Sequence, residues 1–391
     1  MQTSNESNLE LSIVLPCLNE VMTLAPCIEK AKIALQKNKI QGEIIIADNG
    51  STDGSQKLAR QLGAKVVDVK QKGYGAALMG GIAVANGSLI IMGDADDSYD
   101  FSSIYPIVEE LRKGNQLVMG CRMPRGGGKI MPGAMPWKHR WIGNPILSTI
   151  GRIFFKSNVV DFHCGLRGFH KSAFDEMNLK TTGMEFASEM VIKATLLKMK
   201  ISQTPITLYK DGRDRPPHLR SWRDGWRHLR FMLLFSPKWL FLTPGILLVI
   251  IGLFLTLLLL KSPIHLGEVV LDTNTLLFSS ISMIIGFQLI YFSFFTKIFT
   301  KSVGLLPNEV NTKYIDIFSN LEIGILTGLS FVVIGFALLV KSILYWKHYK
   351  FGIISYPDSL RMVIPAAMML ALGFQIIFGS FFINVLKLPH K

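Results

Sequence analysis

The chain has 391 residues, 49% of them hydrophobic, and carries a formal net charge of +14. Its four cysteines show no CxxC pairing, which argues against a structural zinc site and a disulfide framework and suits a reducing cytosol. The densest positive segment, 213–238, directly precedes a long apolar run, so an anionic membrane surface is favoured over nucleic acid as its partner.

The first ten residues are polar, and we expect a short tail over 1–10 without a signal peptide. Residues 11–212 then alternate short β-rich runs with helix-length stretches. Strands are expected at 11–16, 43–48, 65–69, 88–94 and 116–122, and helices at 19–37 and 53–62. Continuous Ile and Val runs between helices predict an α/β domain with a parallel sheet covered on both faces.

The strongest chemical pattern is GDADDSYD, residues 93–100, directly after a buried strand. Its neighbouring carboxylates Asp94, Asp96 and Asp97 repel one another unless a cation or hydrogen-bond donors lie nearby. Hard oxygen ligands match Mg²⁺ or Mn²⁺, which in turn neutralise a diphosphate. A simple acidic loop end or helix cap is the alternative interpretation.

Polar residues also follow the other expected strands, where parallel sheets bind their ligands. Asn19 and Glu20 come after the first strand and Asp48 after the second. Asp48 is placed to accept hydrogen bonds from a base or ribose, whereas helix capping alone explains Asp53.

The glycine-rich segment KGYGAALMGG, residues 72–81, partly matches a dinucleotide-binding pattern. Its third position is Leu78 rather than Gly or Ala, so we do not expect a dehydrogenase. Lys72, at the start of the expected helix, is placed to meet a phosphate or the acidic cluster. No Walker A sequence is present, which disfavours a P-loop ATPase.

Two segments have the composition of membrane-surface structure. Gly- and Pro-rich residues 123–145 predict a loop placed to act as a lid, and 137–155 resembles a basic, aromatic amphipathic helix. An ordinary loop and surface helix are the alternative. The segment 213–238, with Trp222 and Trp226 four apart, predicts interfacial juxtamembrane helices, a solvated linker being the alternative.

A transmembrane domain is expected over 239–391, with spans at about 239–260, 275–299, 321–344 and 363–386. The positive-inside rule puts the N-terminal domain and the C-terminus in the cytoplasm. The expected outer loop, 341–362, nevertheless carries Lys341, Lys347, Lys350 and Arg361, which weakens the orientation of the last two spans.

The segments LSIVLPCLNE, ADNGSTDGS, KGYGAAL, GDADDSYD, MGCR and DFHCGLRGF occur in the order found in family 2 inverting glycosyltransferases. Over residues 11–235 the chain resembles the polyprenyl-phosphate (dolichol-phosphate) hexose synthase branch. The resemblance implies a GT-A, Rossmann-like fold in a multi-pass protein of a bacterial or archaeal-type cell membrane, with its catalytic domain in the cytoplasm.

Carried onto matching positions, the resemblance also implies roles for single residues. The nucleotide-sugar pocket is expected to include Pro16, Asn19, Glu20, Asp48 and Asp94, and Lys72 is added to it because of its position at a helix start. Asp94 and Asp96 would hold the metal. Asp161, Arg122 and Arg140 are the expected catalytic residues, Asp161 acting as a base or orienting Arg167. The acceptor phosphate would meet Arg122, Arg140 and Arg167.

The reaction implied by the resemblance is transfer of one hexose, of the glucose or mannose class, from a nucleotide-diphosphate sugar to polyprenyl or dolichyl phosphate, with Mg²⁺ or Mn²⁺ as cofactor. Trp137 stands where the QxxRW pattern of processive synthases needs Gln, which favours a single transfer. Asp97 and Ser98 replace the Leu and Gln of many relatives and leave the third metal contact open. A homo-oligomer is compatible with the sequence.

Other interpretations stay open from the sequence. A lipid without a phosphate, such as diacylglycerol, would need Asp161 as a base, and a catalytically inactive membrane scaffold would have no reason to keep three carboxylates together. Glu185 and Glu189 share a helix face as acceptor-side groups or as solvated charges. His163 and His170 lack partners at metal-binding spacing, which favours structural roles.

Overall fold

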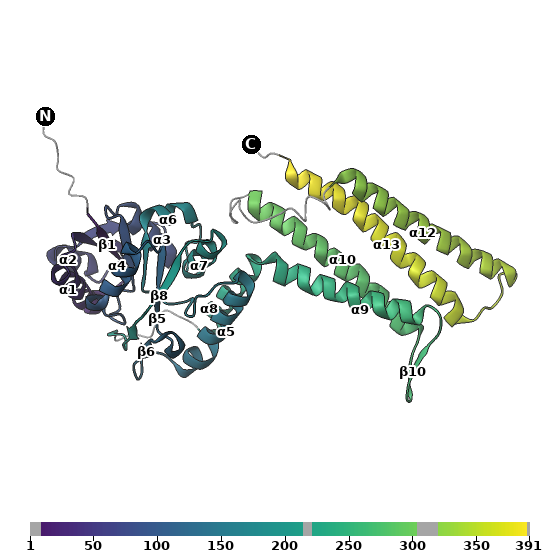
Figure 1. Cartoon of the computed structure of the whole chain (residues 1–391), viewed down its shortest axis with the longest axis horizontal. Helices are drawn as coiled ribbons and strands as arrows, with labels where there is room; N and C mark the ends of the chain where they lie inside the picture. The colour runs from purple at the N-terminus through teal and green to yellow at the C-terminus, as the bar shows by residue number, and fades with distance from the viewer. Residues whose placement is uncertain (1–8, 214–220, 303–319, 389–391) are drawn as a thin grey trace. The chain divides into compact units, whose positions relative to one another are not determined.

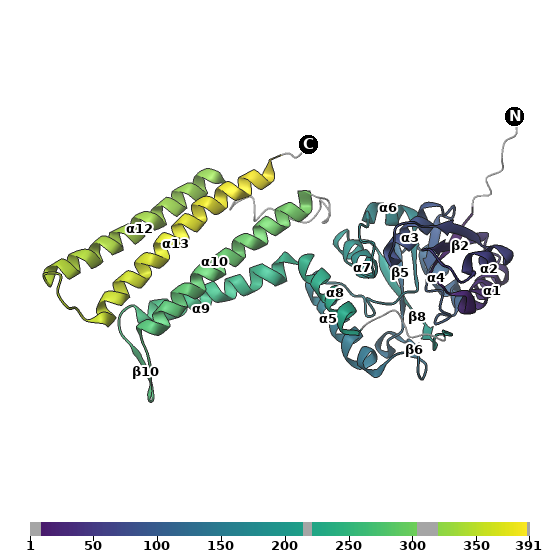
Figure 2. The same ribbon diagram turned by 180° about the vertical axis from the view of Figure 1, so that it is seen from behind.

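The structure is a computed structural model that describes residues 9–213, 221–302 and 320–388. The chain divides into two compact units, Met1–Met232 and Leu233–Lys391. Figures 1 and 2 show a sheet surrounded by helices in the first unit and long helices in the second. Most of the expected polar tail, 1–10, lies outside the described residues.

A seven-stranded sheet with the order β3-β2-β1-β4-β7-β5-β8 forms the centre of the first unit. Its strands are β1 (Leu11–Cys17), β2 (Gly42–Asp48), β3 (Lys65–Asp68), β4 (Leu89–Met92), β5 (Leu117–Cys121), β7 (Arg167–His170) and β8 (Ile201–Pro205). β1 pairs in parallel with β2 and β4, and β5 pairs in parallel with β8. The mostly parallel sheet is thus confirmed, and the five expected strands are all present.

The residue pattern does not predict β7, which runs antiparallel between β4 and β5. Its sequence, Arg-Gly-Phe-His, contains no apolar run, so its own β-propensity is weak. Backbone pairing with a strand on each side stabilises it instead. Such pairing is a tertiary property that local periodicity does not contain.

Helices cover both faces of the sheet because alternate β1 side chains point in opposite directions. Ile13 and Leu15 belong to the core cluster that α1 and α4 complete, whereas Val14 faces Gly81 of α3. The helices of this unit are α1 (Val21–Lys37), α2 (Ser55–Gln61), α3 (Tyr74–Ala83), α4 (Tyr105–Arg112), α5 (Asn144–Phe155), α6 (Lys171–Met177), α7 (Phe186–Leu196) and α8 (Ser221–Leu234).

The Gly- and Pro-rich stretch after β5 contains only short elements. A two-residue strand, β6 (Lys129–Ile130), pairs with β9 (Thr207–Leu208), and a π-helical turn, η3 (His139–Gly143), leads into α5. The expected amphipathic helix is present as α5, and its apolar side chains Ile146 and Ile153 are 52% and 53% exposed. This unit therefore presents an apolar helix face rather than an ordinary polar surface.

The expected juxtamembrane helix is present as α8, in which Trp226 is 58% exposed. The Trp222 side chain and residues 214–220 lie outside the described part of the chain.

Four helices of the second unit are long and apolar enough to cross a membrane. They are α9 (Thr243–Leu259) with the preceding turn η4 (Lys238–Leu242), α10 (Thr273–Ser302), α12 (Leu321–His348) and α13 (Tyr356–Lys387). The expectation of four helices long and apolar enough to span a membrane is thus confirmed. A hairpin of β10 (Ile264–Leu266) and β11 (Val269–Leu271) connects α9 to α10.

Glycines allow close packing within two helix pairs of this unit. A Cβ on Gly245 of α9 would lie 2.8 Å from the Gly286 carbonyl oxygen of α10. In the same way, a Cβ on Gly328 of α12 would lie 2.8 Å from the Gly373 carbonyl oxygen of α13. Small residues at such contacts let membrane helices approach closely.

The loop between the last two spans is shorter than expected, because α12 continues to His348 and α13 begins at Tyr356. Lys341 and Lys347 therefore lie in α12, and Arg361 lies in α13. Arg361 pairs with Asp272 and, at 3.9 Å, with Asp358. Part of the positive charge in the expected outer loop, 341–362, is thus neutralised locally.

Candidate active site

Two carboxylates at the end of β4 form the acidic part of the site. The Tyr74 hydroxyl donates a hydrogen bond to Asp94 Oδ1 at 2.9 Å, and Asp96 Oδ1 accepts two from Ser98, at 2.6 and 3.1 Å. Burial, together with the negative charge of Asp96, raises the pKa of Asp94 to about 6. A cation bound between the two carboxylates would reduce the electrostatic repulsion between them.

Asp97 has a positive partner of its own. It adopts a φ of 62°, and its carboxylate lies 2.7 Å from Lys30 Nζ. This ion pair explains Asp97, so Asp94 and Asp96 remain as the metal candidates of the motif.

Arg213 bridges two predicted site residues from a distant part of the chain. Its guanidinium lies 2.8 Å from Glu20 Oε1 and 3.2 Å from Asp96 Oδ2. Its segment also binds the acidic loop through the backbone, because Gly212 N–H donates to the Asp96 carbonyl oxygen at 3.1 Å. The sequence pattern assigned residue 213 to a juxtamembrane stretch, and only long-range pairing reveals its place here.

Asp48 ends β2 and is fully buried. Burial alone would raise the pKa of Asp48, but hydrogen bonds from Ser51, Gln56 and Gly50 outweigh it and lower the pKa. These bonds hold Oδ2, whereas Oδ1 is buried without a hydrogen-bond partner among the described residues. An orphaned buried acceptor is costly, and a donor on a ligand would satisfy it.

The remaining residues of the expected nucleotide pocket lie beside this turn. Asn19 Oδ1 accepts a hydrogen bond from Thr52 N–H at 2.8 Å, which ties the β1 and β2 loops together. Lys72 Nζ donates to the Asn49 carbonyl oxygen at 2.6 Å, so it lies at the β2 end. Pro16 is part of β1, in register with Ala47 of β2.

The glycines of the KGYGAAL segment serve close packing. A Cβ on Gly73 would lie 2.2 Å from the Thr182 carbonyl oxygen, and a Cβ on Gly75 would lie 2.5 Å from that of Thr181. The loop at 181–183 therefore needs both glycines. The chemically active member of the segment is Tyr74, the partner of Asp94, which spacing alone did not single out.

A buried ion pair joins the motifs MGCR and DFHCGLRGF. Arg122 Nε and Nη2 each lie 2.8 Å from an Asp161 oxygen, and the Arg122 backbone N–H donates to the same carboxylate at 3.0 Å. Burial would raise the pKa of Asp161, but Arg122 lowers it below its usual value. Asp161 therefore orients Arg122, not Arg167 as expected from the sequence.

Arg167 is fully buried and donates to backbone carbonyl oxygens of its own region. Its partners are Cys164, Phe162 and Ala187. These bonds shape the chain around β7, and no face of the side chain is exposed to an incoming lipid. Arg167 is therefore not placed to contact the acceptor phosphate, in contrast to the expectation from the sequence.

Arg140 lies in η3, with its guanidinium 5.3 Å from the centre of the Trp141 ring. Its Nε is buried and has no hydrogen-bond partner within the described ranges. It forms no ion pair with the other predicted site residues that the structure describes. An anion reaching this turn would meet an unsatisfied donor.

Two further predictions concern residues that prove structural. Glu189 is fully buried, pairs with Lys193 at 2.9 Å and accepts hydrogen bonds from the backbone N–H groups of Lys180 and Thr181. It is therefore neither a solvated charge nor an acceptor-side group. Burial lowers the pKa of His163 well below its usual value, and His170 Nε2 lies 3.1 Å from the Leu111 carbonyl oxygen, so both histidines occupy structural environments.

Within the described residues, no group of three or more His, Cys, Asp or Glu side chains gathers closely enough to hold a metal by itself. Mg²⁺ commonly takes only one or two carboxylates when a substrate diphosphate supplies further oxygens. The Asp94 and Asp96 pair fits that smaller ligand set. The site thus suits a divalent cation that binds together with a diphosphate.

Comparisons with known proteins give a consistent picture. Residues 12–177 match glycosyl transferase family 2, and residues 294–387 match the glycosyltransferase family 2 C-terminal transmembrane region. The chain is 35% identical over 377 residues to the low-salt glycan biosynthesis hexosyltransferase Agl6 of Haloferax volcanii, covering 96% of this chain and 89% of that protein.

Two other relatives are more distant. A dodecaprenyl-phosphate galacturonate synthase of Rhizobium johnstonii is 30% identical over 180 residues, covering 44% of this chain and 51% of its own. A dolichyl-phosphate hexose transferase of Haloferax volcanii is 23% identical over 167 residues, covering 42% and 69%. Among solved structures, glucosyl-3-phosphoglycerate synthase of Mycobacterium tuberculosis matches with a TM-score of 0.46 and 20% identity, over 58% of this chain and 80% of that one.

Proposed function

Because the chain belongs to glycosyltransferase family 2, we propose that it moves one hexose, of the glucose or mannose class, from a nucleotide-diphosphate sugar to a polyprenyl or dolichyl phosphate. The chain is an integral membrane protein, since its C-terminal part matches the family's transmembrane region. Two relatives named for lipid-phosphate substrates support this acceptor class. We assign the catalytic unit to the cytoplasmic face by positive-inside counting.

Binding of the nucleotide-sugar donor is supported by the polar residues that lie together at the carboxyl ends of adjacent strands, around Asp94. Glu20 and Asp94 follow β1 and β4, and Asp48 is the last residue of β2; the three strands are adjacent in the sheet. The unpartnered Asp48 Oδ1 would accept a hydrogen bond from the base or ribose. Pro16, Asn19 and Lys72 would line the same pocket, and Lys72 would approach the diphosphate.

The acidic pair and Arg213 would stabilise the leaving group. A Mg²⁺ or Mn²⁺ ion, when bound, acts as a Lewis acid toward the departing diphosphate, and Asp94 and Asp96 would hold it. Arg213 pairs with Glu20 and Asp96, so its positive charge is already fixed beside the expected diphosphate. Charge that is oriented before the reaction stabilises a transition state most effectively.

The state of Asp161 favours a phosphate acceptor over a hydroxyl. Arg122 occupies both carboxylate oxygens and lowers the pKa of Asp161, which makes it a weak base. A diacylglycerol hydroxyl needs a base to activate it. A lipid phosphate is already anionic near neutral pH and needs only alignment, which Arg122, held by Asp161, would help to provide.

The acceptor would approach along the apolar face of α5. Exposed Ile146 and Ile153 suit contact with lipid, and Arg140 lies just before this helix with an unsatisfied Nε. A guanidinium binds phosphate oxygens in a bidentate way that lysine cannot reproduce. Arg140 is thus the proposed ligand of the lipid phosphate.

The test is transfer of radiolabelled sugar into organic extract, comparing polyprenyl phosphate with polyprenol and diacylglycerol. We expect label only with the phosphate, as a glycosyl phosphate that mild acid releases. Arg140→Ala should lower kcat/KM for the acceptor by at least about tenfold, whereas Arg140→Lys should lose less.

Lys138→Ala is the matched control, since Lys138 is an exposed cation two residues before Arg140. This variant should behave like the wild type. Equal transfer to polyprenol or diacylglycerol that is insensitive to Arg140→Ala would replace the proposed acceptor with a non-phosphate lipid. Absence of transfer from every nucleotide-sugar tested would favour the inactive scaffold.

A further inference from the structure

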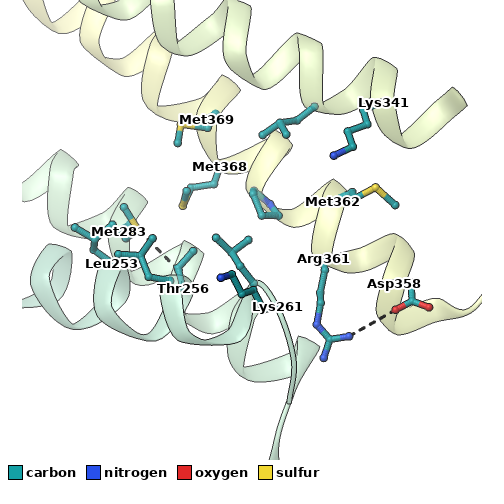
Figure 3. A pocket seen from close by; sticks show the side chains of 14 residues that line it. Leu253, Thr256, Lys261, Met283, Lys341, Asp358, Arg361, Met362, Met368 and Met369 are labelled. Atoms are coloured by element: carbon teal, nitrogen blue, oxygen red, sulfur yellow. Dashed lines mark hydrogen bonds and ion pairs between the residues drawn. The ribbon is translucent and has the colours of Figure 1, made fainter. Parts of the chain in front are cut away.

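The second unit contains a pocket of about 520 Å³ between its four membrane helices. Side chains from α9, α10, α12 and α13 line it, as Figure 3 shows. The proposed glycosyl transfer does not use any of these residues, so the pocket calls for a separate explanation.

Three cations line this pocket. Lys261, Lys341 and Arg361 line it, and Asp358 is the one lining carboxylate within the described residues. Arg361 is held by Asp272 and Asp358. Lys261 and Lys341 form no ion pair or hydrogen bond with any residue that the structure describes, so their charges are available to an anion.

The cations lie toward the same end of the four-helix unit. Lys261 follows the end of α9, Lys341 lies in the last third of α12, and Arg361 lies in the second turn of α13. Charged side chains near the ends of membrane helices reach the head-group region, where phosphate groups lie. Since α9 is a span, this end lies in the leaflet opposite to the one where Lys238 enters.

The rest of the pocket lining is mostly apolar, and it includes flexible side chains. Met283, Met368 and Met369 lie on the side away from Lys341 and Arg361 in Figure 3. Leu253 and Leu257 add branched side chains to the lining. Methionine side chains are flexible and fit irregular apolar partners. A ligand that matches both the cations and the apolar side chains of this lining has an anionic head and hydrocarbon chains.

We propose that this basic pocket binds a membrane lipid with an anionic phosphate head group. Lys261 and Lys341 contact the phosphate, Arg361 is fixed beside them by its carboxylate partners, and the chains lie along the methionine side. The site belongs to the transmembrane unit and does not depend on the proposed sugar transfer.

Binding to purified full-length protein tests the proposal, with dioctanoyl-phosphatidylglycerol as the probe. Zwitterionic dioctanoyl-phosphatidylcholine and inorganic phosphate serve as comparisons. The anionic lipid should bind most tightly and raise the melting temperature, because a ligand that binds only the folded state stabilises it. In the Lys261→Gln/Lys341→Gln variant the affinity should fall at least about tenfold, since two charge-assisted contacts are lost.

Two further variants separate the contributions of charge and apolar contact. Lys347→Gln removes an exposed α12 cation that does not line the pocket and should bind the anionic lipid as the wild type does. Leu257→Trp changes a 60% exposed lining residue, so folding should tolerate it while the added volume weakens lipid binding. Equal affinity for the two lipids, or unchanged binding by the double variant, would overturn the proposal. Inorganic phosphate binding as tightly as the anionic lipid would show a free-anion site instead.

Discussion

Single carboxylates of this protein have different partners, and the partner decides what each can do. Asp97 is neutralised by Lys30 and Asp161 by Arg122, whereas Asp94 lies beside another carboxylate and Asp48 keeps one buried oxygen without a partner. Asp96, next to Asp94, also contacts Arg213, which the proposed site places beside the diphosphate. Asp94 and Asp48 are therefore the two carboxylates best suited to bind a cation and a hydrogen-bond donor of the nucleotide-sugar, respectively.

The acidic pair makes the first prediction. Asp94→Asn or Asp96→Asn should lower the transfer rate at least about 100-fold, or roughly 2.7 kcal/mol, because the metal loses a charged ligand. Excess chelator should have the same effect on the wild type, and Mg²⁺ or Mn²⁺ should restore activity. Lys30→Ala, which leaves Asp94 and Asp96 in place, should lose much less, and full activity in chelator would eliminate the metal.

Asp161 gives a prediction about stability. Asp161→Asn leaves Arg122 as a buried, uncompensated charge, so unfolding should become easier by about 3–5 kcal/mol. Thermal unfolding of the purified protein measures this, with Asp100→Asn as a control at a partly buried carboxylate that has no ion pair among the described residues. Asp100 bonds only to neighbouring serines in the described region. An unchanged melting temperature with lost activity would indicate a catalytic base instead of an ion-pair partner.

At the scale of elements, α5 reverses the usual arrangement of a surface helix. Its buried residues include Ser148 and Gly151, while Ile146 and Ile153 are exposed. In water such a face costs free energy, which contact with lipid would recover. The helix is thus suited to a domain that works at a membrane surface.

We therefore expect Ile146→Glu/Ile153→Glu to raise the KM for polyprenyl phosphate severalfold, while the KM for the nucleotide-sugar stays constant. The charged face would repel the anionic membrane and its lipid. Ile33→Glu on α1, at a residue that is 50% exposed, is the matched control and should change neither constant. Parallel changes in both constants would indicate misfolding rather than lost lipid contact.

At the scale of the whole molecule, an even number of spans returns the chain to the side from which it entered. Four span-length helices follow the first unit among the described residues. The positive-inside rule assigns that side to the cytoplasm, although Lys341 and Arg361 at the other membrane face run against it. Binding of an anionic lipid head would explain why cations are kept there.

Cysteine labelling in intact cells tests the topology. Glu268→Cys, in the hairpin after α9, should react with a membrane-impermeant maleimide from outside, whereas Lys113→Cys should react only after the membrane is opened. The four native cysteines are buried and should give little background. The same labelling pattern at both positions would reject the assigned orientation.

The parallel strands, the acidic segment after β4 and the four span-length helices can be predicted from the sequence. These follow from apolar runs and their periodicity, which are local properties of the chain. The resemblance to the family can also be recognised from the sequence, because six short motifs occur in the family's order.

Only the tertiary structure shows which residues far apart in the sequence contact one another. β7 is stabilised by pairing with a strand on each side. Arg213 pairs with Glu20, which lies 193 residues earlier in the chain. Asp161 pairs with Arg122 rather than with Arg167. The basic pocket likewise combines Lys261, just after α9, with Lys341 of α12 and Arg361 of α13. Each of these contacts depends on long-range packing, and a charged residue does not show in its own sequence neighbourhood which opposite charge it will meet.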